Sequence, residues 1–468
     1  MEHSMSAQSS ESLCHLNATD LVAGYRRGDF SPVEVLDAVL SRTERLNPRF
    51  NMFFHIAQES ARQEALVSER RWKEGQPLGL LDGVPVSIKD SIAMKGAPMQ
   101  VGSRALRKIV SAQDAPPAAR LREAGAVLFA KTTMPDHGMF GSGVSTAFGV
   151  TRNPWNPAFN TGGSSSGAGA ALAAGLGALS VGTDIAGSVR FPASLCGLAS
   201  LKPTHGLVPH LPVVAVREAG PMARSARDLA AMLHVLAGTD KRDYGSFPAL
   251  AAGVPGWREP KGLRVGLLLD VGYGNKAEPA VVAAVRNAAE TLARAGAQVE
   301  EMSALLNVDV LVPLAQMSAT TMLARFEAMS QEQRDLSYLP LLEFAERARR
   351  LTALDYQAAI QAVDVAKAEV VRATAAYDYV LAPVVNKVNW AAESNAPDDD
   401  DIYRLTSYCG MFNQTGQPVG CVCAGFDERG LPIGMQIIGQ RFDDRGVMQL
   451  AEQYEALRGF DMQWPECQ

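Results

Sequence analysis

Residues 162–192, GGSSSGAGAALAAGLGALSVGTDIAGSVRFP, constrain the chain more than any other stretch. Two turns rich in glycine and serine, residues 162–167 and 182–188, flank an alanine-rich run that is typical of a helix. Small residues let a backbone pass close to a ligand, and free N–H groups in such turns can point at an anion. Serine adds a hydroxyl that can be a nucleophile or a proton relay. The stretch therefore indicates a site, although each turn taken singly is compatible with an ordinary loop.

Composition excludes several classes of function. The chain has 468 residues, 47% hydrophobic and 20% charged, as in a globular enzyme with a sizeable core. A net charge of −6 argues against a phosphate-neutralising surface, so we expect no nucleic-acid partner. No apolar run is long enough for a membrane span, and the start, MEHSMSAQSSESLCHLN, lacks a signal-peptide pattern. We expect a cytoplasmic protein, with residues 1–16 as a flexible tail. The six cysteines form no C-x-x-C pair, which argues against a zinc ribbon.

The order of helix and strand signals predicts an α/β fold. Ser31-Pro32-Val33-Glu34 is typical of a capping box, and the helix that follows is expected to stop before Pro48. Helix–glycine–strand units at residues 115–132 and 278–302 predict a mixed, mostly parallel twisted sheet covered by helices on both faces. We expect one domain over residues 17–468. A linker candidate at 240–260 is too short and mixed to mark a boundary.

Ser165 is the obvious candidate nucleophile, because GSSSG matches the G-x-S-x-G elbow of α/β-hydrolase esterases. That motif requires a strand directly before the turn, and the preceding PWNPAFNT is a poor strand. It also requires a downstream histidine with an acid partner, for which His205, His210 and His234 are the candidates. The elbow is therefore an alternative rather than the favoured interpretation.

Lys89 fits these turns better. It ends the strand-like segment VPVSIKD, and strand ends in open α/β sheets commonly face the site. A lysine in water is a poor base at neutral pH, but desolvation lowers its pKa so that the neutral amine can accept a proton. Serine–lysine catalysis then needs a hydroxyl to relay the proton, and the two turns could supply both serines. The alternative for Lys89 alone is a salt bridge with Asp90 or another acid.

Three segments resemble the amidase signature family. The run GGSSSGAGAALAAGLGALSVGTDIAGSVRFPASLCGLASLKPT is similar to its central motif, VPVSIKD to its lysine strand and GLPIGMQIIG to its C-terminal strand. The resemblance covers about residues 20–457. It implies a serine hydrolase with a Ser–cis-Ser–Lys triad and an acyl-enzyme on a single mixed-sheet α/β domain. The catalytic motifs would lie in residues 80–230, helices at about 310–376 would cover the substrate, and no metal or other cofactor would be needed.

Matched motif by motif, the resemblance assigns each residue a role. Lys89 would be the base, Ser164 the relay that follows a cis peptide bond, and Ser188 the acylated nucleophile. The backbone at Gly138 would contact the substrate, while the neighbouring His137 is expected to be structural or solvent-facing.

The resemblance also implies an oxyanion hole in the second turn. Its members would be the backbone N–H groups of Ile185, Ala186, Gly187 and Ser188. Two residues depart from the family pattern, since Ser166 and Ala186 stand where glycines are usual. Ala186 would be costly if the turn needed a positive φ there.

The implied activity is cleavage of the C–N bond of an aryl or alkyl amide, or of a carbamate as in a urethanase. We expect the chain to act as a monomer or homodimer. The alternative within the family is the glutamine-hydrolysing subunit of a tRNA-dependent amidotransferase. Amidotransferase members usually carry a glutamine at the position of Phe191, which argues against that alternative.

Overall fold

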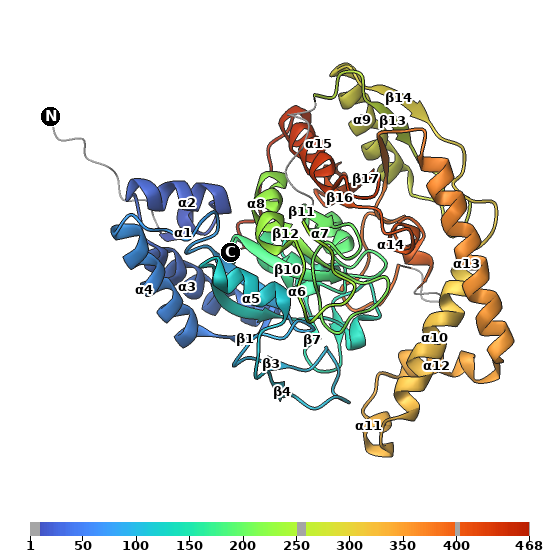
Figure 1. The fold of residues 1–468 in the computed structure, drawn as a ribbon, viewed down its shortest axis with the longest axis horizontal. Helices are drawn as coiled ribbons and strands as arrows, with labels where there is room; N and C mark the ends of the chain where they lie inside the picture. Colours follow the sequence, from blue (N-terminus) through green and yellow to red (C-terminus); the bar gives the residue numbers. More distant parts are fainter. Residues whose placement is uncertain (1–9, 250–258, 398–402, 468) are drawn as a thin grey trace.

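One large sheet forms the centre of the molecule. The computed structural model describes residues 10–249, 259–397 and 403–467 (Figure 1). Among these residues, eleven strands form a single sheet. In spatial order they are β1 (Phe53–Ile56), β5 (Val127–Thr132), β2 (Pro85–Lys89), β10 (Leu179–Asp184), β12 (Glu218–Ala223), β11 (Ala199–Lys202), β16 (Val419–Phe426), β17 (Pro432–Gly439), β15 (Tyr379–Pro383), β13 (Arg264–Leu267) and β14 (Gln298–Glu301). The predicted single α/β domain with a mixed sheet is confirmed.

Contrary to expectation, the sheet is not mostly parallel, because four of the ten neighbouring pairs in its described strands are parallel. Strands β5, β2 and β10 are mutually parallel, as are β15, β13 and β14. Every other neighbouring pair in the described sheet is antiparallel. The helix–strand units predicted the two parallel groups. The antiparallel centre arises because β16 and β17 are joined by a short turn and β11 and β12 by a loop, neither with a crossover helix between them.

Helices cover both faces of the sheet. Helices α8 (Ala226–Leu236), α9 (Pro279–Arg294) and α15 (Asp444–Leu457) pack over one face, and α6 (Ser166–Ala173) and α7 (Arg190–Cys196) over the other. Strand β16 shows the alternation, because Val422 belongs to the hydrophobic cluster of the first group of helices and Cys421 to that of the second. The site described below lies on the α6–α7 side.

The first long helix begins as predicted and ends later. In α3 (Pro32–Phe50), Ser31 Oγ accepts the Glu34 N–H at 3.2 Å, while the Glu34 carboxylate accepts the Ser31 N–H at 2.7 Å. The expectation that the helix stops before Pro48 is wrong. Proline lacks one N–H, and in the last turn this loss does not prevent the helix from continuing to Asn51, whose φ of 53° ends it.

The described part of the expected N-terminal tail is ordered. Residues 1–9 lie outside the described ranges, as do residues 250–258 of the linker candidate. Helix α1 (Ser10–Leu13) packs on α3, where Glu11 accepts a hydrogen bond from Arg45 at 3.0 Å and pairs with Arg42. Leu13 and Cys14 are buried. Within the described residues, no helix combines the length and apolar character needed to cross a bilayer.

The segment expected to cover the site is helical. It contains α10 (Leu311–Glu327), α11 (Gln331–Asp335), α12 (Leu339–Glu346) and α13 (Ala353–Thr374), drawn yellow to orange beside the sheet in Figure 1. Met322 and Phe326 of α10 and Leu341 of α12 are buried in one hydrophobic cluster with Phe140. The apolar residues of these helices thus pack mainly against one another and against the loop that contains Phe140.

Candidate active site

Two neighbouring parallel strands place Lys89 close to the second turn. Strands β2 and β10 lie side by side, with Val181 opposite Ile88. Since parallel strands end at the same edge of a sheet, Lys89 at the end of β2 lies next to the turn at residues 185–188, which follows β10. The first turn leads into α6. The sequence interpretation recognised α6 but missed β10, because LSVGTD is short and continues the alanine-rich run.

Lys89 is surrounded by hydroxyl groups. Its Nζ donates to Ser164 Oγ at 2.7 Å, to Thr183 Oγ1 at 2.9 Å and to Ser165 Oγ at 3.0 Å. The peptide bond between Gly163 and Ser164 is cis, as the family resemblance implied. The side chain of Lys89 is completely buried. The structure thus brings together the predicted base, the predicted relay and two further hydroxyls.

Burial weakens the basicity of Lys89. Desolvation is the main cause that lowers its pKa to about 7, and the attraction of Asp184 only partly opposes it. No ion pair among the described residues includes Lys89. Asp90 instead accepts backbone N–H groups from Gln100 and Gly102, each at 2.8 Å, so the alternative of a Lys89–Asp90 salt bridge is wrong.

Ser188 lies on the second turn, against the first. Its carbonyl oxygen accepts the N–H of Ser165 at 3.1 Å, which ties the two turns together. Ser188 is half-buried, and within the described ranges its hydroxyl has no hydrogen-bond partner. The hydroxyl is therefore free to meet a ligand at the mouth of the site.

The second turn presents several backbone donors. Among the described residues, the N–H groups of Ile185, Ala186 and Ser188 find no acceptor, whereas Gly187 donates its N–H to Asp184 at 2.7 Å. The positive φ of the turn falls at Gly187, at 123°, and not at Ala186. The expected strain at Ala186 is thus absent. Three of the four predicted oxyanion donors are available for a ligand, and the fourth holds the turn.

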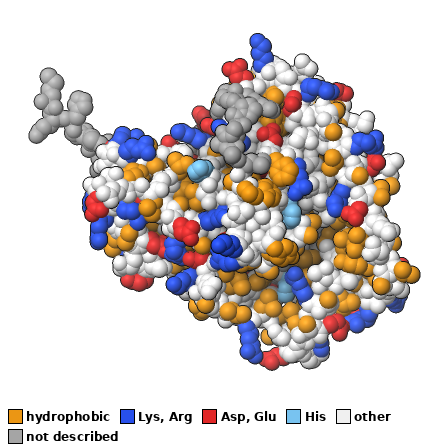
Figure 2. All heavy atoms as spheres, viewed as in Figure 1, with side chains coloured by type: hydrophobic (Ala, Val, Ile, Leu, Met, Phe, Trp, Pro, Cys, Tyr) orange, Lys and Arg blue, Asp and Glu red, His pale blue; other side chains and the backbone are white. Residues whose placement is uncertain are grey.

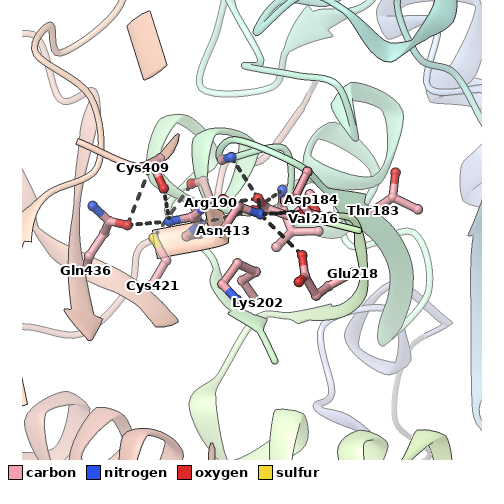
Figure 3. Close-up of polar contacts among 12 residues, drawn as sticks. Thr183, Asp184, Arg190, Lys202, Val216, Glu218, Cys409, Asn413, Cys421 and Gln436 are labelled. Atoms are coloured by element: carbon pink, nitrogen blue, oxygen red, sulfur yellow. Dashed lines mark hydrogen bonds and ion pairs between the residues drawn. The ribbon is translucent and has the colours of Figure 1, made fainter. Parts of the chain in front are cut away.

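A buried charge network supports this turn (Figure 3). The Asp184 carboxylate accepts the Gly187 and Val189 N–H groups and forms a fully buried ion pair with Arg190 at 2.9 Å. Burial opposes ionisation of Asp184, but Arg190 and the hydrogen bonds, including one from Asn413, outweigh it and hold the pKa of Asp184 well below its usual range. Both charges are therefore retained in the interior.

The network extends from Arg190 to the far strands of the sheet. Arg190 donates to Gln436 Oε1 at 2.7 Å, to Asn413 Oδ1 at 2.5 Å and to the carbonyl of Cys409 at 3.3 Å. Sequence reasoning missed these residues. The sequence offered one signal for the network, which is Arg190 itself. A single charged residue between Val189 and the apolar run that follows indicates that the charge is buried with a partner.

The elbow interpretation of Ser165 is wrong. Its hydroxyl bonds to Lys89 and to the carbonyl of Thr183 at 3.4 Å, and no histidine of the described chain contacts it. A strand does precede the turn, contrary to expectation, but β9 (Asn156–Asn160) pairs with the short β8 (Arg152–Asn153) and forms one isolated bridge from Phe159 to Ala391, outside the central sheet. Of the candidate histidines, His205 bonds to Glu218 at 2.9 Å.

Gly138 lies beside Ser164. Its φ is +70°, and a Cβ there would be 3.3 Å from Ser164 Oγ and 3.1 Å from the Met134 methyl group. The neighbouring His137 packs edge-to-face on Phe326 with ring centroids 5.9 Å apart. At the other departure from the family pattern, Ser166 starts α6 and donates to the Thr133 carbonyl at 3.3 Å.

Comparisons with known proteins identify the family. The Amidase family model matches residues 34–448. A glutamyl-tRNA(Gln) amidotransferase subunit from Synechococcus sp. (strain CC9605) is 35% identical, over 92% of this chain and 93% of that protein. The structure of a 6-aminohexanoate cyclic dimer hydrolase superposes with a TM-score of 0.85 at 28% identity, covering 97% and 99% of the two chains. A bacterial aryl acylamidase of the amidase signature family superposes with 0.84 at 27% identity, covering 97% and 98%. The chain belongs to the amidase signature family of enzymes, which act on C–N amide bonds.

Proposed function

We propose that this chain is a stand-alone amide hydrolase in which Ser188, Ser164 and Lys89 form the catalytic triad. The observation that carries the proposal is the buried amine of Lys89, which contacts Ser164 Oγ at 2.7 Å and has no carboxylate partner in the described chain. An amine with a pKa of about 7 is half neutral near pH 7, where it is suited to accept and return a proton.

In the first half of the reaction, Ser188 Oγ attacks the amide carbonyl. Its proton passes to Ser164 Oγ as the Ser164 proton passes to neutral Lys89. The N–H groups of Ile185, Ala186 and Ser188 stabilise the negative oxygen. The proton on Lys89 then returns through Ser164 to the departing nitrogen, and the C–N bond breaks. The products of this half are a free amine and an ester on Ser188.

In the second half, water attacks that ester. The same relay removes a proton from the water, and it returns a proton to Ser188 Oγ as the acid product leaves. An aryl amide, an alkyl amide and a carbamate all present a planar carbonyl and release an amine, so the relay serves each of them.

The curated relatives favour a second candidate, the catalytic subunit of a tRNA-dependent amidotransferase. Those at 32–35% identity are named as a subunit of a glutamyl-tRNA(Gln) amidotransferase. Two observations favour the stand-alone hydrolase. The solved structures that superpose on most of the chain include an acylamidase and a cyclic-dimer hydrolase. At the position of the amidotransferase glutamine, Phe191 packs its ring against Gly187 and is buried in an apolar cluster.

The face of the molecule drawn in Figure 2 gives no second observation for the amidotransferase. On the face shown in Figure 2, basic and acidic side chains are interspersed rather than gathered into one basic area. The two candidates separate in an assay of the lone chain with anilides, aliphatic amides, aryl carbamates and glutamine. Turnover of anilides or amides by the lone chain supports the hydrolase, and glutamine hydrolysis that requires added partner proteins supports the amidotransferase.

Covalent labelling tests the assignment of the nucleophile. A fluorophosphonate probe is expected to modify one residue, Ser188, because its hydroxyl is half-buried and lies beside the free backbone donors of the turn. Peptide mapping by mass spectrometry identifies the modified residue. Modification of Ser165 instead would contradict the proposed triad.

The pH dependence tests the base. Because the reaction requires neutral Lys89, kcat/KM is expected to fall tenfold per pH unit below about pH 7 and to level off above it. The measurement is kcat/KM for a substrate without titratable groups, between pH 5 and pH 9.

Glu455 supplies the control for this profile. Burial raises the pKa of this carboxyl to about 7 as well, and it accepts the Ala226 N–H at 2.8 Å, away from the site. Glu455→Gln keeps an acceptor oxygen and removes the titration. The decrease of kcat/KM below about pH 7 should persist in this variant. If it disappears, titration of Glu455 and not of Lys89 causes it.

A further inference from the structure

Two arginines near the second turn have no acidic partner among the residues that the structure describes. Arg217 immediately precedes β12, and the register of β12 with β10 pairs Glu218 with Asp184. The next pair along the strands therefore places Arg217 beside Ile185, the first residue of the turn. The Arg217 guanidinium donates to the carbonyl of Pro212, and its buried Nε has no acceptor in the described chain.

The second arginine approaches from the helical segment. Arg325 lies on α10 next to Phe326, whose ring contacts His137 with centroids 5.9 Å apart. His137 adjoins Gly138, where a Cβ would lie 3.3 Å from Ser164 Oγ. The Arg325 side chain is exposed, and its charge is near enough to act on His137.

The two cations are close enough to repel each other. Burial is the main cause that lowers the pKa of Arg217 to about 10, and the charge of Arg325 is the second. Burial, followed by Arg325, also lowers the pKa of His137 to about 4. The Glu218 carboxylate opposes these effects on Arg217 only in part, so the two like charges favour an anionic ligand beside them.

Two other arginines of the helical segment do have acidic partners. Arg349 pairs with Glu346 at 2.6 Å, and Arg372 pairs with Glu369. Neither Arg217 nor Arg325 takes part in an ion pair with any described residue. Arg334, Arg347 and Arg350 of the same segment also form no ion pair with a described residue, so the place of Arg325 near His137, and not the missing partner alone, supports a ligand at the site.

Buried nitrogens near these arginines also lack acceptors. His210 is only 4% exposed, and neither of its ring nitrogens has a hydrogen-bond partner within the described residues. Its pKa is lowered to about 3 by burial first, and then by Arg217 and Lys89, so it lies near both charges. His137 Nε2 is likewise buried without a partner. Unsatisfied buried nitrogens are rare in folded proteins, and a ligand oxygen could accept the one N–H that each neutral imidazole carries.

We propose that Arg217 and Arg325 bind a carboxylate of the substrate, so that the chain cleaves amides that carry an acidic group a few bonds from the scissile carbonyl. The inference rests on the proposed hydrolase function and names its substrate class. The planar guanidinium offers parallel N–H groups that match a carboxylate, and each such charge-assisted pair typically contributes about 10- to 100-fold in affinity.

Two anilides of the same length test the proposal. Glutaric acid mono-4-nitroanilide carries a carboxylate, and 5-methylhexanoic acid 4-nitroanilide replaces that carboxylate with a neutral branched end of similar shape. We expect wild-type kcat/KM to favour the acid by about 10- to 100-fold. Arg217→Gln and Arg325→Gln should each lower this preference about tenfold. Equal wild-type values for the two anilides, or an unchanged preference in both variants, would overturn the proposal while leaving the hydrolase function intact.

Arg349→Gln is the matched control. It removes the same charge from the same helical segment, at an arginine that already has a carboxylate partner. The preference for the acidic anilide should persist in this variant. A preference lost equally in Arg349→Gln would mean that net charge, and not the site, selects the substrate, and this would also overturn the proposal.

Calorimetry separates failure of the site from failure of the proposed function. If the wild-type chain cleaves neither anilide, glutarate and uncharged glutaramide are titrated into it. Tighter binding of glutarate that weakens about tenfold in Arg325→Gln supports the carboxylate site without any turnover. Equal binding or no binding of both compounds counts against it. Tighter binding of inorganic phosphate than of glutarate would overturn the choice of carboxylate.

Discussion

Ser188→Ala and Lys89→Met are each expected to lower kcat/KM by about 10⁴- to 10⁶-fold, and the double variant should lose no more than either single variant. Without Ser188 there is no nucleophile, and without Lys89 the Ser164 hydroxyl has no base to pass a proton to. Because the three groups act as one unit, removing a second member removes nothing further. The measurement is the steady-state hydrolysis of one anilide by all three variants.

Lys131→Met provides the control for loss of a buried lysine. Lys131 is completely buried on β5, the strand next to β2, and donates only to backbone carbonyls, those of Asp90 and Ile92. The substitution removes a buried amine of the same kind without touching the relay, so folded Lys131→Met protein should keep most of its activity. A loss as large as that of Lys89→Met, or losses that multiply in the double variant, would contradict the proposed relay.

The residues of the relay could be predicted from the sequence because they stand in a long family motif. Their arrangement could not be predicted, since the order of strands in the sheet does not follow the chain. Lys89 lies next to the second turn because β10 is the neighbour of β2 in the sheet. Strand β10 was not predicted, because its residues continue an alanine-rich run. Even with that strand recognised, the register places Gly182 opposite Lys89, so the contact of Lys89 with Thr183 follows only from the three-dimensional structure.

The charge network around Asp184 and Arg190 could not be predicted from the sequence, for a different reason. Asp184 and Arg190 are six residues apart and could have been paired by inspection, but Asn413 and Gln436 come from more than 200 residues away. Polar residues that meet across a sheet carry no local periodicity, so only the fold identifies them. Arg217 is a similar case, because its place beside Ile185 follows from the register of two antiparallel strands.

Asp184→Asn is expected to destabilise the protein by about 3–5 kcal/mol, because it leaves the fully buried Arg190 charge without its counter-ion. The variant also weakens the acceptor that holds the N–H groups of Gly187 and Val189, so the second turn should lose its fixed geometry. Urea unfolding measures the first effect, and kcat/KM of the folded fraction measures the second.

A second substitution separates charge from positioning. Asp184→Asn combined with Arg190→Met removes both buried charges and should recover part of the lost stability. It should not recover activity, because the turn that carries Ser188 still lacks its carboxylate. Asp364→Asn breaks the exposed ion pair with Lys367 at 2.8 Å and should stay within about 1 kcal/mol of the wild type. Recovery of activity in the double variant would show that Asp184 serves only to neutralise Arg190. The Asp184 carboxylate would then have no part in holding the nucleophile.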